Sequence, residues 1–128
     1  MTGLRGLLRR RGGGRRTGIA AITVVRDEPE MLPRWVAHYG REVGLDHLVV
    51  VDDGSTDGST QGLPCRVMTN PGFPEGDFER ARMRLVSELA VDLLRTHEAV
   101  VFCDVDELLV ADPVRHDGLA GLLRAREG

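Results

Sequence analysis

The stretch that decides the fold is AVVFCDVDELLV, residues 99–110. Its apolar first half predicts a buried strand of a parallel sheet. Asp104 and Asp106 are two residues apart, so both point to one side of an extended backbone. Two neighbouring carboxylates need a counter-charge, and Mg²⁺ or Mn²⁺, which prefer oxygen ligands, can supply it. The stretch therefore predicts a strand that ends in a metal site. A solvated acidic turn is the competing interpretation.

A second acidic stretch follows another predicted strand. Residues 47–51 (HLVVV) are apolar and β-branched, and they lead directly into DDGSTDGS, residues 52–59, which has the composition of a loop. In open α/β sheets, ligands bind where parallel strands end. We therefore expect Asp52 and Asp53 to lie at the same edge of the sheet as the first acidic stretch.

Strands and helices alternate along the rest of the chain. Further strands are predicted at residues 19–25 and 65–69, and apolar residues recur at helical spacing over 30–43 and 78–97. A short helix is expected at 118–126. This order predicts an α/β fold with a mostly parallel sheet.

Charge is unevenly distributed along the 128 residues. Six arginines and no acidic residue lie within the first 16 positions, which leaves 11 arginines against 20 acidic residues in the remainder. This acidic remainder of the chain argues against nucleic acid as a partner. We expect residues 1–17 to form a basic, disordered leader and residues 18–128 to hold the folded part. The alternative for the leader is peripheral contact with anionic lipid head groups.

Other features limit the class of protein. Cys65 and Cys103 both lie in apolar runs, which is typical of core thiols rather than of a disulfide. No apolar run is long enough to cross a membrane, and the N-terminus lacks the apolar segment of a secretory signal. These features favour a cytoplasmic protein, with the inner membrane face as the place of any peripheral contact.

The two acidic stretches suit a nucleoside-diphosphate sugar. Its base and ribose need hydrogen-bond acceptors, and its diphosphate needs a cation that stabilises the leaving group. Asp53 or Asp52 can accept from the base or ribose, Asp104 can reach the ribose or the metal, and Asp106 can bind the metal. We expect Glu107 to cap the turn, although it could also orient a metal-bound water.

These residues also resemble a known family. VVVDDGSTDGS at 49–59 and VVFCDVDELLV at 100–110 are similar to the nucleotide-binding loop and the DXD metal motif of glycosyltransferase family 2, which has the GT-A fold. One branch of that family is similar over residues 23–58, although Asp27 stands where the branch usually has Asn. The matching residues are Glu28, Leu32, Trp35, His38, Gly44, Asp46 and His47. The resemblance covers about residues 18–112.

The resemblance implies roles for particular residues. Val25 and Asp27 would lie near the base, Asp53 would hold it, and Asp104 and Asp106 would serve the ribose and a Mn²⁺ or Mg²⁺ ion. The donor would be a UDP-sugar, and the acceptor a glycan or another hydroxyl compound. The family's catalytic base and acceptor site follow the DXD motif, whereas 22 residues follow Asp106 here. We therefore expect a truncated, Rossmann-like GT-A domain that binds the donor and lacks the base, and we assign no catalytic residue.

Three other interpretations were weighed. A non-catalytic nucleotide- or partner-binding remnant stays open, and an unpaired sheet edge would invite self-association. A calcium loop starting at Asp53 is excluded, because Pro64 occupies the position of its bidentate Glu. A phosphatase of the haloacid dehalogenase type is disfavoured, because Glu107 and Leu108 follow the acidic motif.

Several conspicuous side chains are expected to be structural. Trp35 and Tyr39 lie on the apolar stripe of a predicted helix, so we expect them in the core. The four histidines, His38, His47, His97 and His116, show no metal-binding spacing, and the last two are expected at the surface. Three arginines, Arg80, Arg82 and Arg84, are expected to form a solvated helix face, unless one of them reaches a diphosphate.

Overall fold

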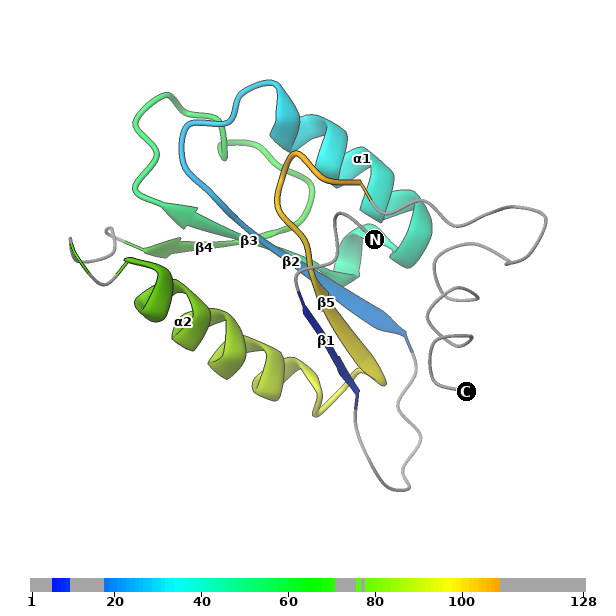
Figure 1. Ribbon diagram of the computed structural model, residues 1–128. Coiled ribbons are helices and arrows are strands. Elements are labelled where there is room, and N and C mark those ends of the chain that lie inside the picture. The colour runs from blue at the N-terminus through cyan, green and yellow to red at the C-terminus, as the bar shows by residue number, and fades with distance from the viewer. Residues whose placement is uncertain (1–5, 10–17, 71–75, 77, 109–128) are drawn as a thin grey trace.

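A five-stranded sheet with one helix on each face forms the protein in the computed structural model (Figure 1), which describes residues 6–9, 18–70, 76 and 78–108. The elements in chain order are β1 (Gly6–Arg9), β2 (Ile19–Val25), α1 (Met31–Val43), the 3₁₀ turn η1 (Leu45–His47), β3 (Leu48–Asp53), β4 (Arg66–Asn70), α2 (Phe78–Leu93) and β5 (Ala99–Phe102). The protein is thus an α/β protein, as predicted.

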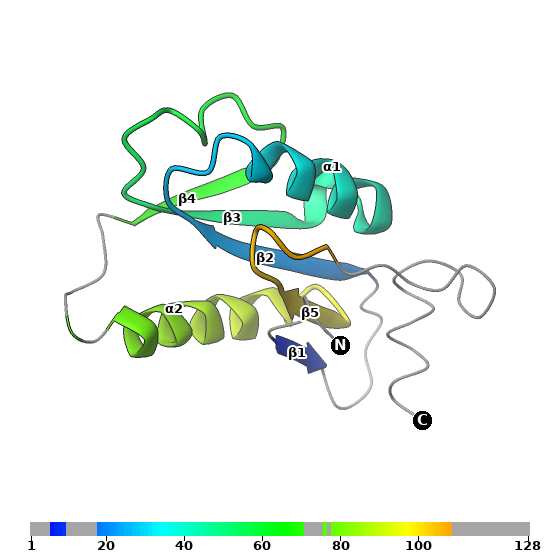
Figure 2. The same ribbon diagram turned by 45° about the horizontal axis from the view of Figure 1, so that its top comes forward.

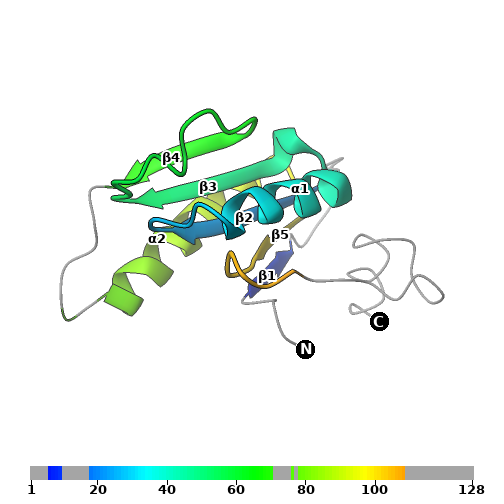
Figure 3. The ribbon, with the colours of Figure 1, turned by 90° about the horizontal axis from the view of Figure 1, so that it is seen from above.

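Four strands of the sheet are parallel. The spatial order is β1-β5-β2-β3-β4, and β2 pairs in parallel with both β3 and β5 (Figure 3). A parallel β3–β4 pair completes this part of the sheet. Since all four strands run the same way, the loops that follow them emerge at one edge, the carboxyl edge.

The expectation of a disordered leader over residues 1–17 is wrong for four of its residues. Gly6–Arg9 forms β1, which pairs antiparallel with β5. The exposed flank of β5 offers backbone hydrogen-bonding groups, and pairing with β1 satisfies them without requiring a strongly β-forming sequence. The other residues of the leader lie outside the described part of the chain.

Helix α1 covers one face of the sheet, as Figure 2 shows. Its apolar stripe includes Trp35 and Tyr39, both fully buried, with ring centroids 5.0 Å apart. This confirms the prediction that they belong to the core. They pack among alternate strand residues, including Ile19, Leu48 and Val101.

Helix α2 covers the opposite face (Figure 2). Val86, Leu89, Ala90 and Leu93 pack on the strand residues that alternate with the first set, among them Ile22, Val49 and Phe102. Phe78, expected on the same stripe, is 41% exposed. The parity of a strand residue therefore tells which helix it faces, and in β3 it assigns Asp52 and Asp53 to opposite faces of the sheet.

A histidine pair ties the opposite, amino edge of the sheet together. His47, just before β3, and His97, just before β5, are joined by a 2.8 Å hydrogen bond between Nδ1 and Nε2. The other ring nitrogen of His97, Nδ1, lies 3.1 Å from the Leu93 carbonyl oxygen and 2.9 Å from the Thr96 hydroxyl, so both nitrogens of this ring have hydrogen-bond partners. His97 is buried, which corrects the expectation that it lies at the surface.

Other predictions have mixed outcomes. Cys103 is buried and Cys65 is half-buried. Within the described residues, no helix has both the length and the apolar character needed to cross a membrane. The predicted helix at 118–126, and His116, lie outside the described residues.

Candidate functional site

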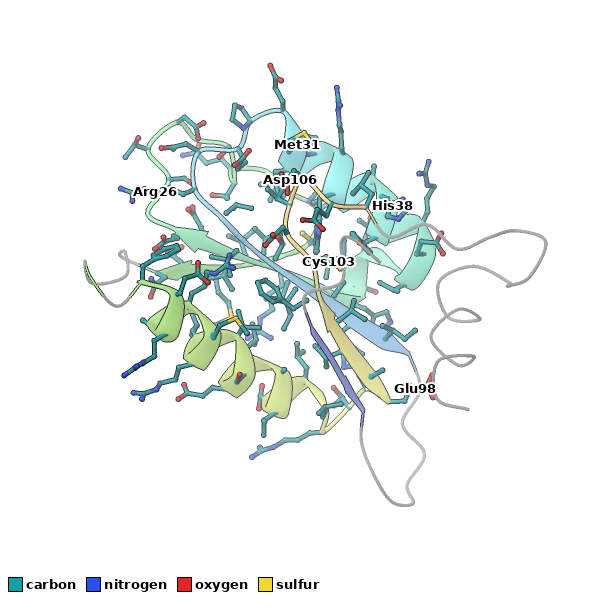
Figure 4. The ribbon with its side chains drawn as sticks, viewed as in Figure 1. Arg26, Met31, His38, Glu98, Cys103 and Asp106 are labelled. Atoms are coloured by element: carbon teal, nitrogen blue, oxygen red, sulfur yellow. The ribbon has the colours of Figure 1, made fainter. Side chains whose placement is uncertain are left out.

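An acidic turn follows β5 at the carboxyl edge. The strand ends at Phe102, earlier than the sequence suggested, and the Glu107 N–H donates to the Asp104 carbonyl at 3.0 Å. Asp104 and Asp106 therefore come together on a turn and not along an extended strand. Figure 4 shows Asp106 beyond Cys103 at this end of β5, with Glu98 at the other end.

The turn also brings Glu107 into the cluster. One carboxylate oxygen from each of Asp104, Asp106 and Glu107 lies within 4.8 Å of the others. Two contacts hold the turn against the core: Val105 is buried beneath it, and the Tyr39 hydroxyl donates to the Glu107 carbonyl at 3.3 Å. Helix α1 thus fixes the backbone on which the acidic side chains stand.

This donor set fits a hard divalent cation. All three ligand groups are carboxylates, and Mg²⁺ and Mn²⁺ prefer oxygen ligands. Asp106 is exposed, and Asp104 and Glu107 are half-buried, so solvent or substrate oxygens can complete the coordination sphere. The cluster is therefore a candidate metal site whose remaining positions face outward.

A polar cavity of about 420 Å³ opens beside the cluster. Its walls come from the end of β2, the loop after it, the first turns of α2 and the acidic turn. The lining residues are Val24, Glu28, Glu79, Arg82, Asp104, Val105 and Asp106. Four of these seven side chains are carboxylates and one is a guanidinium, so the cavity suits a cation together with an anionic group.

The cation in the cavity wall is Arg82 of α2. Its guanidinium lies 3.7 Å from Asp104 and 3.6 Å from Glu79, and its side chain is only 17% exposed. We expected three solvated arginines on this helix. Arg80 and Arg84 are exposed as predicted, whereas Arg82 points into the site.

Asp53 lies at the same edge, two strands away. By parity Asp53 belongs to the α2 face, as does Val24 of the intervening strand β2, and Asp104 contacts Arg82 of α2. Two strand spacings, about 10 Å, separate β3 from β5. Asp53 is 3% exposed and accepts a 3.3 Å hydrogen bond from the Asn70 amide. A buried carboxylate has capacity for more than one donor, so Asp53 can accept a further hydrogen bond.

Asp52 serves the loop that follows it. Its carboxylate accepts the Ser55 N–H at 2.8 Å and the Thr60 hydroxyl. Burial opposes ionisation of Asp52, but the hydrogen bonds from Thr60 and Ser55 outweigh it and lower the pKa of this carboxyl below its ordinary value of 3.8. Of the two candidate base-binding residues, Asp52 thus has its acceptors occupied by the loop, whereas Asp53 has acceptor capacity left for a ligand.

Asp27 joins the end of β2 to the same loop. Its carboxylate accepts the N–H groups of Thr56 at 2.7 Å and Asp57 at 3.1 Å, and its own N–H donates to the Ser55 hydroxyl at 2.9 Å. Its φ of +52° is left-handed, a conformation that Asn and Asp tolerate better than most residues. Asp can therefore adopt this conformation at a position where the branch with the similar motif usually has Asn. The Val25 side chain is buried in the core, so any contact with a base would come from its backbone.

The structure adds two features that the sequence analysis did not find. The inward position of Arg82 follows from the helical phase relative to Val86, which could have singled it out. The His47–His97 pair spans 50 positions in the chain and has no local signal.

The fold and the site define an α/β protein with a polar site at the carboxyl edge of a parallel sheet. Comparison of the chain with protein-family models, with curated proteins and with solved structures gives no match. The site itself and the motifs quoted above therefore carry the functional inference.

Proposed function

We propose that the protein binds a nucleoside-diphosphate sugar together with Mn²⁺ or Mg²⁺, as a member of glycosyltransferase family 2 with a GT-A-type fold. The observation that carries this proposal is the placement of Asp53, at the end of β3, and of the acidic turn, after β5, on either side of β2 at the carboxyl edge of the sheet. An elongated ligand can reach both places at once.

Each end of the site suits one part of that ligand. Asp53 would accept a hydrogen bond from the base or ribose, because its buried carboxylate has spare acceptor capacity. Asp104, Asp106 and Glu107 would hold the cation. A bound cation would neutralise the negative charge that the diphosphate gains as its bond to the sugar breaks. UDP is the nucleotide that the family resemblance favours.

Transfer to an acceptor has a further requirement. A general base must lie within hydrogen-bond reach of the acceptor hydroxyl, and we assign that role to none of the described residues. The proposal therefore concerns donor and metal binding first. Binding without turnover would favour the alternative of a non-catalytic nucleotide-binding protein.

Thermal unfolding and calorimetric titration with UDP, Mn²⁺, both and neither test the proposal. We expect UDP to stabilise the protein only when Mn²⁺ is present, by about 2.7 kcal/mol at a hundredfold excess over the dissociation constant. The exposed Asp106 can be changed to Ala with little cost to folding, and D106A should abolish this stabilisation.

The matched control is Asp92→Ala. Asp92 is exposed on α2 and pairs with Arg95 at 3.9 Å, away from the cavity. D92A should keep the response to UDP and Mn²⁺. A chain that unfolds cooperatively but responds to neither ligand, or a D106A variant that responds like the parent protein, would contradict the proposal. Incubation with a UDP-sugar and Mn²⁺ then separates a transferase from a binding protein.

A further inference from the structure

Arg82 has more hydrogen-bonding capacity than its neighbours use. An arginine carries five N–H donors in a planar fork. Both carboxylates beside it, on Asp104 and Glu79, lie at 3.6–3.7 Å, beyond good hydrogen-bond length. Its Nε is buried and has no hydrogen-bond partner. A guanidinium with unused donors at a cavity wall indicates that a stronger acceptor belongs in the cavity.

Aromatic rings keep the guanidinium at this position. Its central carbon lies 5.3 Å from the ring centroid of Phe102 and 5.9 Å from that of Phe78. Both distances are within the range of cation–π attraction. The Arg82 side chain is therefore packed against two rings at the wall of the cavity.

The charges in the cavity wall indicate what the acceptor is. Among the described residues that line the cavity, Arg82 is the one cation, and it stands against Glu28, Glu79, Asp104 and Asp106. A diphosphate would be repelled by these carboxylates unless positive charge accompanies it. A divalent cation provides part of that charge, and the fork of Arg82 matches phosphate oxygens.

We infer that Arg82 changes partners when the ligand binds. In the free protein it neutralises Asp104, and in the complex it donates hydrogen bonds to a diphosphate oxygen while the cation takes over Asp104. Arg82 thus opposes binding of the metal alone and favours binding of the metal together with a nucleoside diphosphate. This inference rests on the proposed function and adds to it the residue that selects the diphosphate.

Titrations of Mn²⁺ alone, and of UDP in saturating Mn²⁺, test this inference on Arg82→Gln. Because R82Q removes a positive charge beside a metal ligand, we expect about three- to tenfold tighter Mn²⁺ binding. Because R82Q also removes charge-assisted hydrogen bonds, we expect it to bind UDP at least about tenfold more weakly than the parent protein does. The exposed Arg84→Gln on the same helix makes the same change in net charge and should alter neither constant by more than about twofold.

The opposite signs of the two effects distinguish this role from a structural one. Weaker binding of both ligands by R82Q would mean that Arg82 only supports the fold, and constants like those of R84Q would show that it contacts neither ligand; either result overturns the inference and leaves the proposed function standing. A parent protein that binds no UDP in Mn²⁺ overturns both. If R82Q does not unfold cooperatively, Arg82→Lys serves as the test variant. R82K keeps the positive charge but lacks the planar fork, so it should keep the Mn²⁺ affinity and lose UDP affinity. Unchanged UDP affinity in R82K would overturn the inference.

Discussion

Individual carboxylates at the carboxyl edge divide into two groups by their partners. Asp27 and Asp52 accept hydrogen bonds from the loop at residues 55–60 and shape it. Asp104 and Asp106 of the acidic turn line the polar cavity, and Asp53 lies at the same edge of the sheet with one hydrogen bond, from Asn70. The first group shapes the loop, and the second is the group on which the proposed function depends.

The low pKa of Asp52 makes the stability of the protein depend on pH. Its folded pKa lies below the ordinary 3.8. The stabilisation is therefore fully present above pH 3.8 and is lost as the pH falls through the lower, folded value. We expect Asp52→Asn to be less stable than the parent protein at pH 7, with the difference shrinking below pH 3.8. Urea unfolding from pH 7 to pH 3 measures it.

Asp46→Asn is the matched control for this experiment. Asp46 is an exposed carboxylate in η1, at the amino edge of the sheet. The free energy of unfolding of D46N should follow that of the parent protein across the whole pH range. A constant difference between D52N and the parent protein down to pH 3 would show that ionisation of Asp52 does not stabilise the fold.

Among the elements, the junction of α1, η1 and β3 depends on one glycine. Gly44 ends α1 with a φ of +99°, and its N–H donates to the Gly40 carbonyl at 3.0 Å. An added Cβ would lie 3.2 Å from the ring of His47, which is held by its bond to His97. Position 44 therefore restricts both the backbone and the side chain.

We expect Gly44→Ala to lower the free energy of unfolding by about 1–3 kcal/mol, because it adds left-handed strain to a close contact. Gly62→Ala is the matched control, since Gly62 has a φ of +71° but nothing within 4 Å of an added Cβ. Urea unfolding of the two variants separates backbone strain from crowding. Equal losses at the two positions would rule out the contact with His47 as a cause.

Elements with a strong local signal were predictable from the sequence. The strand at 19–25 has the predicted bounds, and helix α1 begins one residue after its expected start. Strand β5 is shorter than expected: its residues pair with β2 through Phe102, the Cys103 N–H still donates to Ile22, and the chain then turns. Strand β1 was missed because its pairing depends on an exposed flank of β5 some ninety residues later, which no local pattern reveals.

The candidate site was predictable only where local sequence patterns determine the position of a residue. Residue order placed Asp53, Asp104 and Asp106 at the carboxyl ends of strands, which the structure confirms as positions at one edge. It could not show that Asp27 and Asp52 have partners in a neighbouring loop. Those contacts join positions 3 to 30 residues apart through loop geometry, which side-chain periodicity does not encode.

At the scale of the whole molecule, strand β1 closes one flank of the parallel sheet. It pairs with β5 over four residues, and Gly6 lines an apolar cavity of about 170 Å³ next to Met83 and Val86 of α2. Without β1, the backbone groups along that flank of β5 would be unpaired, and unpaired edges promote pairing between chains.

Deletion of residues 1–9 should therefore lower the free energy of unfolding by about 1–3 kcal/mol, from backbone hydrogen bonds worth about 0.5–1.5 kcal/mol each. It should also make the protein self-associate as its concentration rises. Denaturant unfolding and light scattering after size-exclusion chromatography measure the two effects. Deletion of residues 1–5, which leaves β1 in place, should change neither, and a monomeric 1–9 deletion of parental stability would contradict the prediction.

The pairing of β2 with β5 also determines the order in which the chain can fold. Ile19 lies beside Ala99, so the central strand of the sheet waits for a partner eighty positions later, while its other neighbour, β3, arrives much sooner. Contacts this distant in sequence slow folding, because a long loop must close before they form. During synthesis, β2, β3 and α1 can associate early, but β2 keeps an exposed flank until β5 emerges. The acidic turn follows β5 directly, so its three carboxylates come together in the same late step in which β5 pairs with β2.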